Sequence, residues 1–232
     1  HTATAQTEYT ANGVKHSRRY YVSRDCDVII TEINAEEAAS LSFDVSLSRA
    51  FRCREEVISD GLLKISGTLD SGTEKPGMSY AAYAQILTEG KNARIEGGKV
   101  YDADKAWIII SAATSWFEGD DYDRKAREIL ARVTDNFDYE RIYNASVQAH
   151  KALYDRASVH LESDAASASL PADERILAYS EGAKDNHLAS LYYNYGRYLL
   201  ISSTREGSLP PNLQGLWANT YQTPWNGDYH TN

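Results

Sequence analysis

The pattern of apolar residues changes once along this chain, near Phe117, from strand-like runs to helical spacing. Before that point, Asn12-Gly13 and Gly97-Gly98 each separate two short strand-like segments. A two-residue turn needs positive φ at both central positions, which these dipeptides tolerate, so each predicts a β-hairpin. Runs rich in β-branched and aromatic residues predict further strands at 28–33, 62–65, 80–87 and 107–112. Strands at this spacing, with no helical period between them, predict an antiparallel β-sandwich over residues 1–117.

After Phe117, residues 121–133 and 139–154 have the spacing of two helices. The segment 163–169 consists of small and polar residues and predicts a linker. We therefore divide the chain into a β-sandwich domain at 1–117, a helical linker region at 118–169 and the beginning of an α-helical domain at 170–232.

Two further helices are predicted in residues 170–232. Pro171 suits the start of one helix, and Gly182 suits its end. Asp185 is a candidate cap for the next helix, in which apolar residues recur at intervals of three and four. Gly207 is expected to end that helix.

Composition and net charge exclude some classes of binding partner. A net charge of −9 over 232 residues argues against nucleic acid or an anionic membrane surface as a partner. No apolar run approaches the roughly 20 residues that a membrane-spanning helix needs, so no membrane insertion is expected.

The two cysteines, Cys26 and Cys53, can pair or stay reduced, and neither has metal-ligand spacing. The first residue is His1 rather than Met, which indicates a processed or cut start, and a secreted or periplasmic protein is expected.

The segment from Ser208 to Asn232 is rich in neutral amides and aromatic rings. It contains four Asn, two Gln, one His, two Tyr and two of the four Trp residues, with Asp228 as its one formal charge. Amides that donate and accept hydrogen bonds suit sugar hydroxyls, and flat aromatic faces suit the C–H faces of pyranose rings. Asp228 follows Asn226-Gly227 and is expected to be a turn residue rather than an acid. The segment therefore predicts the wall of a carbohydrate site.

Five residues of this segment are candidates for substrate binding. Trp217 and Trp225 are expected to stack on sugar, although each can equally pack between helices. His230 is expected to hydrogen-bond a sugar hydroxyl, or else a backbone carbonyl. Asn212 and Gln214 complete the set, and cross-linking of the loop backbone is the alternative that we favour for both.

Several motifs resemble glycoside hydrolase family 95, a family of inverting α-L-fucosidases that includes some α-L-galactosidases. They are Asn212-Leu213-Gln214-Gly215-Leu216-Trp217, Tyr229-His230-Thr231-Asn232 and, upstream, Leu170-Pro171-Ala172-Asp173-Glu174-Arg175 with Tyr192-Tyr193-Asn194-Tyr195-Gly196-Arg197. The resemblance implies that residues 170–232 begin an (α/α)6 catalytic barrel. It also implies a glycan with terminal L-fucose as substrate and no cofactor or metal.

The resemblance assigns one catalytic residue within this chain. Inverting hydrolysis needs an acid on the leaving oxygen and a base that activates water on the opposite face of the ring. In the family, two Asn amides supported by an Asp activate the water and a Glu acts as acid. The first of these amides corresponds to Asn232, and the other groups lie outside residues 1–232. We therefore expect the 232-residue chain alone to be inactive. A non-catalytic carbohydrate-binding β-sandwich module is the alternative from another functional class.

Overall fold

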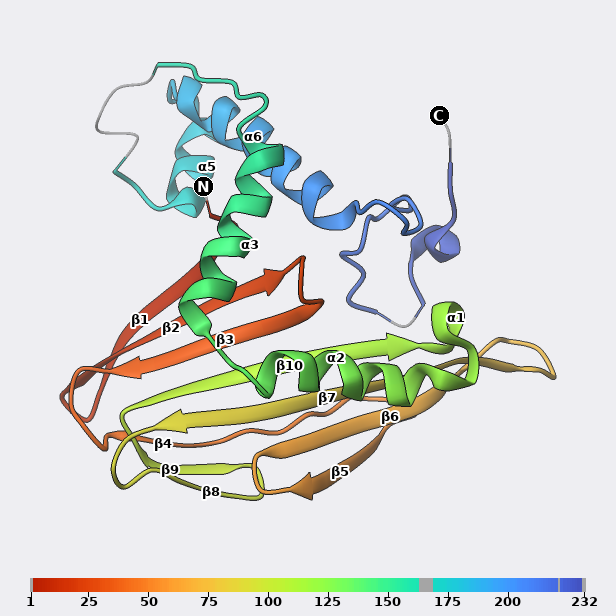
Figure 1. Ribbon diagram of the computed structural model, residues 1–232. Helices are drawn as coiled ribbons and strands as arrows, with labels where there is room; N and C mark the ends of the chain where they lie inside the picture. Colours follow the sequence, from red (N-terminus) through yellow and green to blue (C-terminus); the bar gives the residue numbers. More distant parts are fainter. Residues whose placement is uncertain (1, 163–168, 221, 231–232) are drawn as a thin grey trace. The chain divides into compact units, whose positions relative to one another are not determined.

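The structure is a computed structural model that describes residues 2–162, 169–220 and 222–230 (Figure 1). The described residues form two compact units, Thr2–Ala149 and a second that begins at His150. No described helix is long and apolar enough to cross a membrane.

The first unit consists mainly of two antiparallel sheets (Figure 1). The larger sheet has seven strands in the order β1-β2-β3-β10-β7-β6-β5, and the smaller has three in the order β4-β9-β8. The strands are β1 (Ala5–Ala11), β2 (Val14–Ser23), β3 (Val28–Ala35), β4 (Leu41–Asp44), β5 (Arg54–Ser59), β6 (Leu62–Asp70), β7 (Pro76–Glu89), β8 (Arg94–Glu96), β9 (Lys99–Ala103) and β10 (Lys105–Thr114).

Both predicted hairpins are confirmed. Ala11 pairs with Val14 across Asn12-Gly13, whose φ angles are 52° and 83°. Glu96 pairs with Lys99 across Gly97-Gly98. The four longer predicted strands lie within β3, β6, β7 and β10.

An apolar cluster holds the two sheets face to face. Ile33 and Ile86 of the large sheet pack with Leu41 and Val100 of the small sheet, and all four side chains are buried. This is the arrangement of a β-sandwich, as predicted.

Helix α2 (Tyr122–Thr134) covers the opposite face of the large sheet (Figure 1). It follows the short elements α1 (Ser115–Glu118) and η1 (Gly119–Asp121). Side chains alternate across a strand, so Ile30 and Ile109 point to this face and pack with Ile129 and Leu130 of the helix. The large sheet is therefore covered on both faces.

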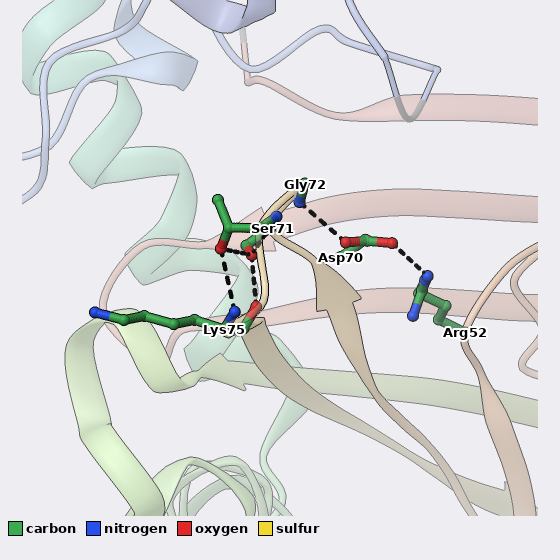
Figure 2. Close-up of polar contacts among 6 residues, drawn as sticks. Arg52, Asp70, Ser71, Gly72 and Lys75 are labelled. Carbon is green, nitrogen blue, oxygen red and sulfur yellow. Dashed lines mark hydrogen bonds and ion pairs between the residues drawn. The ribbon is translucent and has the colours of Figure 1, made fainter.

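Figure 2 shows the turn between β6 and β7, where side chains stabilise the exposed backbone. Asp70 accepts hydrogen bonds from Arg52 Nη2 at 2.6 Å and from the Gly72 N–H at 2.9 Å. The Ser71 hydroxyl donates to the carbonyl oxygen of Lys75 at 2.6 Å. These local bonds fix the turn with no apolar residue at its tip.

The remaining helices are α3 (Tyr139–Tyr154), α5 (Ala172–Ser180), α6 (Asn186–Ser203) and η2 (Pro224–Gly227). Helices were predicted at the positions of α2, α3, α5 and α6, and all four are confirmed. Pro171 is the N-cap of α5, and Gly182 follows its end with a φ of 101°. The predicted linker 163–169 lies outside the described residues except for Ser169.

The predicted end of the last helix is wrong. Helix α6 stops at Ser203 rather than at Gly207, and Thr204 is already extended. The hydroxyls of Ser203 and Thr204 donate to the carbonyl oxygens of Leu199 and Leu200 and satisfy the end of the helix. Ser and Thr compete with the helical ladder in this way, so no glycine is needed at the last turn.

Candidate functional site

Helix α6 leads into the predicted site, and a buried ion pair fixes its start. The predicted cap is confirmed, because Asp185 Oδ1 accepts a hydrogen bond from the Leu188 N–H at 3.1 Å. Arg175 of α5 donates to both oxygens of Asp185, from Nε at 2.8 Å and from Nη2 at 3.0 Å. The two side chains are only 6% and 4% exposed. The hydrogen bond to Asp185 raises the pKa of Arg175, so the guanidinium stays charged.

A second arginine connects α6 to the end of α3. Arg197 Nη1 donates to the carbonyl oxygens of Tyr154, at 2.8 Å, and of Ala157, and Nη2 donates to that of Leu153 at 3.2 Å. The last carbonyls of a helix have no partner within the helix and carry partial negative charge. Arg197 therefore caps α3 and holds α6 against it.

The loop after α6 folds back on itself. The Leu213 N–H donates to the Asp228 carbonyl oxygen at 3.2 Å, and the Tyr229 hydroxyl donates to that of Pro210 at 2.8 Å. These bonds tie the two ends of the candidate carbohydrate segment together.

Asn212 and Gln214 lie inside this folded loop. Asn212 Oδ1 accepts a hydrogen bond from the Gln214 N–H at 3.0 Å, which forms a local turn. Gln214 Nε2 donates to the Pro224 carbonyl oxygen at 2.5 Å. Both amides therefore cross-link the loop backbone, in agreement with the role that we favour from the sequence. Gln214 Oε1 is buried and has no hydrogen-bond partner in the described part of the chain.

The two candidate tryptophans have exposed side chains. Trp217 is 50% exposed and Trp225 is 64% exposed. The edge of the Trp217 indole lies beside Gly215, where an added Cβ would come within 3.0 Å of Cδ1. Trp225 has a φ of 52° in η2, a conformation that is uncommon for a bulky residue. Within the described residues, neither ring makes an aromatic or cation–π contact.

The end of the chain is only partly described. His230 and Asp228 are exposed. The Asp228 N–H donates to the Trp225 carbonyl oxygen at 2.9 Å, as expected of a turn residue. Asn232, the predicted catalytic residue, lies outside the described residues.

The other sequence expectations concern cysteines and metals. Cys26 and Cys53 are both free thiols, so they do not form a disulfide here. Among the described residues, no group of three or more His, Cys, Asp or Glu side chains is placed to hold a metal ion.

Sequence reasoning missed the two arginines that support α6. Arg175 and its partner Asp185 are 10 residues apart, and Arg197 and Tyr154 are 43 apart. No local pattern marks such pairs, because only the packing of the helices brings them together.

Two family descriptions match most of the chain. Residues 138–232 match the glycosyl hydrolase family 95 catalytic domain, and residues 1–119 match the N-terminal domain of glycosyl hydrolase family 65. Over residues 138–232 the chain is therefore similar to glycosyl hydrolase family 95. Its first half belongs to the N-terminal domain family named for family 65.

Three relatives of the chain are named as fucosidases. An alpha-L-fucosidase 2 of Arabidopsis thaliana is 29% identical over 100% of this chain. Proteins named probable alpha-fucosidase A from Aspergillus niger and Aspergillus oryzae are 31% and 26% identical over 67% and 97% of it. The chain spans 31%, 22% and 34% of the lengths of these three relatives.

Proposed function

We propose that this chain is part of an inverting glycoside hydrolase that removes terminal α-1,2-linked L-fucose from glycans. The observation that carries the proposal is the match of residues 138–232 to the family 95 catalytic domain. The names of the three relatives support fucose as the released sugar.

The loop after α6 supplies the proposed substrate contacts. Trp217 and Trp225 have exposed side chains, and indole faces bind the C–H side of a pyranose. His230 is exposed and can donate to or accept from a sugar hydroxyl. Asn212 and Gln214 act mainly through the loop, because their side chains bond to its backbone.

Asn232 is the proposed catalytic residue of this chain. An amide is a weak base, so its role is to hold and polarise the attacking water with the help of a carboxylate. The general acid and that carboxylate belong to parts of the enzyme outside residues 1–232.

The domain organisation follows from the same proposal. Residues 1–117 form the β-sandwich domain, residues 118–169 a helical linker region, and residues 170–232 the start of an (α/α)6 barrel. The exposed apolar side chains of α5 and α6 support this, because in a barrel they pack against further helices. Examples are Ile176, Leu177, Tyr192 and Leu200.

The nearest competing activity is that of an α-L-galactosidase. L-Galactose is L-fucose with an added hydroxyl on C6, and an apolar pocket rejects an added hydroxyl by only about 10²-fold. The complete protein should therefore be tested on both α-L-fucosides and α-L-galactosides.

The deciding experiment follows the hydrolysis of 2′-fucosyllactose by the complete protein with proton NMR. Inversion of an α-linkage releases β-L-fucose first, before mutarotation produces the α anomer. Initial release of the α anomer would contradict inversion, and no release of fucose would contradict the assigned substrate. A 3-linked fucosyl isomer is the matched control for the 1,2-linkage.

A further inference from the structure

A cavity of about 500 Å³ lies at one end of strands β1, β2 and β3. In the sequence, its residues are far from the loop that follows α6. Its volume falls within the range of about 300–1,000 Å³ that is typical of small-molecule sites. All of its lining residues belong to the β-sandwich unit: Glu8, Tyr9, Thr10, Lys15, His16, Ser17, Asn34, Ala35 and Glu36.

Strand register places six polar side chains of this lining on one face of the sheet. Glu8 lies opposite Ser17, and Ser17 lies opposite Asn34, so these three form one row across the strands. Cross-strand neighbours share a face, and residues two apart on one strand also share it. Thr10 and Lys15 therefore form a second row on the same face. Glu36 continues that row, because its N–H donates to the Lys15 carbonyl oxygen at 3.0 Å.

The residues between these two rows point to the other face. Tyr9 pairs with His16, and their rings stack at 5.1 Å between centroids. Ala35 pairs with His16 on the next strand. All three residues of this central row are nevertheless part of the cavity lining.

The charged groups of the cavity already have partners. Lys15 Nζ lies 3.5 Å from a carboxylate oxygen of Glu36, and Gln6 Nε2 donates to Glu8 at 2.7 Å. By contrast, within the described parts of the chain, the side chains of Asn34, Ser17 and Thr10 form no hydrogen bond with protein. One amide and two hydroxyls thus offer several donors and acceptors to a ligand.

We propose that this cavity is a second carbohydrate site, which binds a neutral mono- or disaccharide independently of the catalytic region. Groups that both donate and accept match sugar hydroxyls, which also do both. An anionic ligand is disfavoured, because the cavity carries two carboxylates and one ammonium group and the chain has a net charge of −9. Hydrogen bonds to a sugar compete with hydrogen bonds to water, so we expect weak binding with a Kd of about 1 mM.

Saturation-transfer difference NMR on the complete protein tests the proposal, with lactose as the probe. Lactose is neutral and carries no fucose, so it is not consumed by the proposed activity. The Asn34→Ala variant and the Thr10→Val variant should each lower the lactose signal severalfold. Thr7→Ala is the matched control, because Thr7 is an exposed residue of β1 that points to the opposite face.

Two outcomes would overturn the proposal. One is the absence of any lactose signal with the wild-type protein. The other is a signal that stays unchanged in both cavity variants, which would place the lactose elsewhere on the enzyme. Fucose release from 2′-fucosyllactose should be the same in all of these variants, so loss of this site and loss of the proposed activity are separate results. Unchanged circular dichroism spectra confirm that the variants are folded.

Discussion

At the scale of single residues, the sandwich contains one buried carboxylate with three polar partners. Glu32 of β3 is 5% exposed at its side chain and accepts a hydrogen bond from the Tyr139 hydroxyl at 2.9 Å. Arg19 Nη1 and Lys105 Nζ lie 3.3 and 3.4 Å from its oxygens. A buried charge is tolerated only when it is paired and hydrogen-bonded. Glu32 therefore fixes the start of α3 against the sheet through Tyr139.

The neighbouring Tyr21 provides a contrast. Its hydroxyl is buried and has no hydrogen-bond partner among the described residues. Burial raises the pKa of both Tyr21 and Tyr139, so both phenols are neutral at physiological pH. Of these two hydroxyls, only that of Tyr139 has a hydrogen-bond acceptor among the described residues, which is Glu32.

These two tyrosines give a matched prediction. Tyr139→Phe removes a hydrogen bond to a buried charge and should lower the free energy of unfolding by about 1.5–3 kcal/mol. Tyr21→Phe removes a hydroxyl that is unpaired, so stability should stay unchanged or rise. Urea denaturation followed by far-UV circular dichroism measures both. Equal losses in the two variants would show that the hydrogen bond to Glu32 is not the cause.

The proposed catalytic role of Asn232 gives a prediction on rate. If its amide holds the attacking water, Asn232→Gly in the complete protein should lower kcat by roughly 10²–10⁴. KM should change much less, because the interaction strengthens mainly as the water attacks. Initial rates on 2′-fucosyllactose measure both constants.

The control for Asn232 is Asn219→Gly, which changes an exposed Asn of the same segment. It should retain kcat. An Asn232→Gly enzyme that unfolds at lower temperature but keeps its kcat would assign Asn232 a structural role instead.

At the scale of elements, two glycines without positive φ have opposite surroundings. A Cβ on Gly67 in β6 would lie 1.9 Å from the Arg52 carbonyl oxygen, which is backbone and cannot rotate away. A Cβ on Gly196 in α6 would meet none of the described residues within 4 Å. Gly67 therefore allows a close approach of two backbone segments, whereas Gly196 weakens its helix and has no such neighbour among the described residues.

Alanine substitutions should separate these two cases. Gly67→Ala should destabilise the β-sandwich by about 1–3 kcal/mol through overpacking. Gly196→Ala should stabilise α6 by about 0.5–1 kcal/mol, because alanine restricts the unfolded chain and favours the helix. Thermal unfolding of the complete protein reports both effects. A lower melting temperature for Gly196→Ala would show that another part of the enzyme packs against this glycine.

Local chemistry explains which elements could be predicted from the sequence. The turn at Asn12-Gly13 and the cap at Asp185 depend on residues within a few positions, and both were predicted correctly. Strand β5 was missed because its sequence, Arg-Glu-Glu-Val-Ile-Ser, is an exposed edge with little apolar alternation. The helix end at Ser203 was missed because hydroxyl groups, rather than a glycine, satisfy its carbonyls.

In the candidate site, the residue types could be predicted from the sequence, but the contacts between distant residues could not. Its residue types, amides and indoles, were evident from composition, and so was the turn role of Asp228. The bond from Gln214 to the Pro224 carbonyl joins residues 10 apart. Such a contact depends on how the loop folds back, which residue types alone do not specify.

At the scale of the whole molecule, the proposed chemistry needs no metal ion. Amides and carboxylates would activate the water and stabilise the oxocarbenium-like transition state. We therefore expect dialysis of the complete enzyme against EDTA to leave the rate on 2′-fucosyllactose unchanged. A severalfold loss that Ca²⁺ or Zn²⁺ restores would reveal a metal requirement.

The 232-residue chain, purified by itself, should not release fucose. Catalysis by inversion depends on an acid and a water-activating group held on opposite faces of one sugar, and preorganised electrostatics supplies most of the rate. Asn232 is the one residue proposed here for that machinery, and an amide without its supporting carboxylate activates water poorly. The isolated sandwich should nevertheless fold, because both of its apolar clusters lie within Thr2–Ala149.

Circular dichroism and fucose release from 2′-fucosyllactose, measured on the same preparation, test this prediction. The spectrum should show folded antiparallel sheet while the release stays at the uncatalysed level, and the complete protein is the positive control. Measurable release by the folded 232-residue chain would mean that an acid and a base lie within it. Asp228, the one acidic side chain of the segment from Ser208 to Asn232, would then be the first residue to replace. In that case Asp228→Asn should abolish the release.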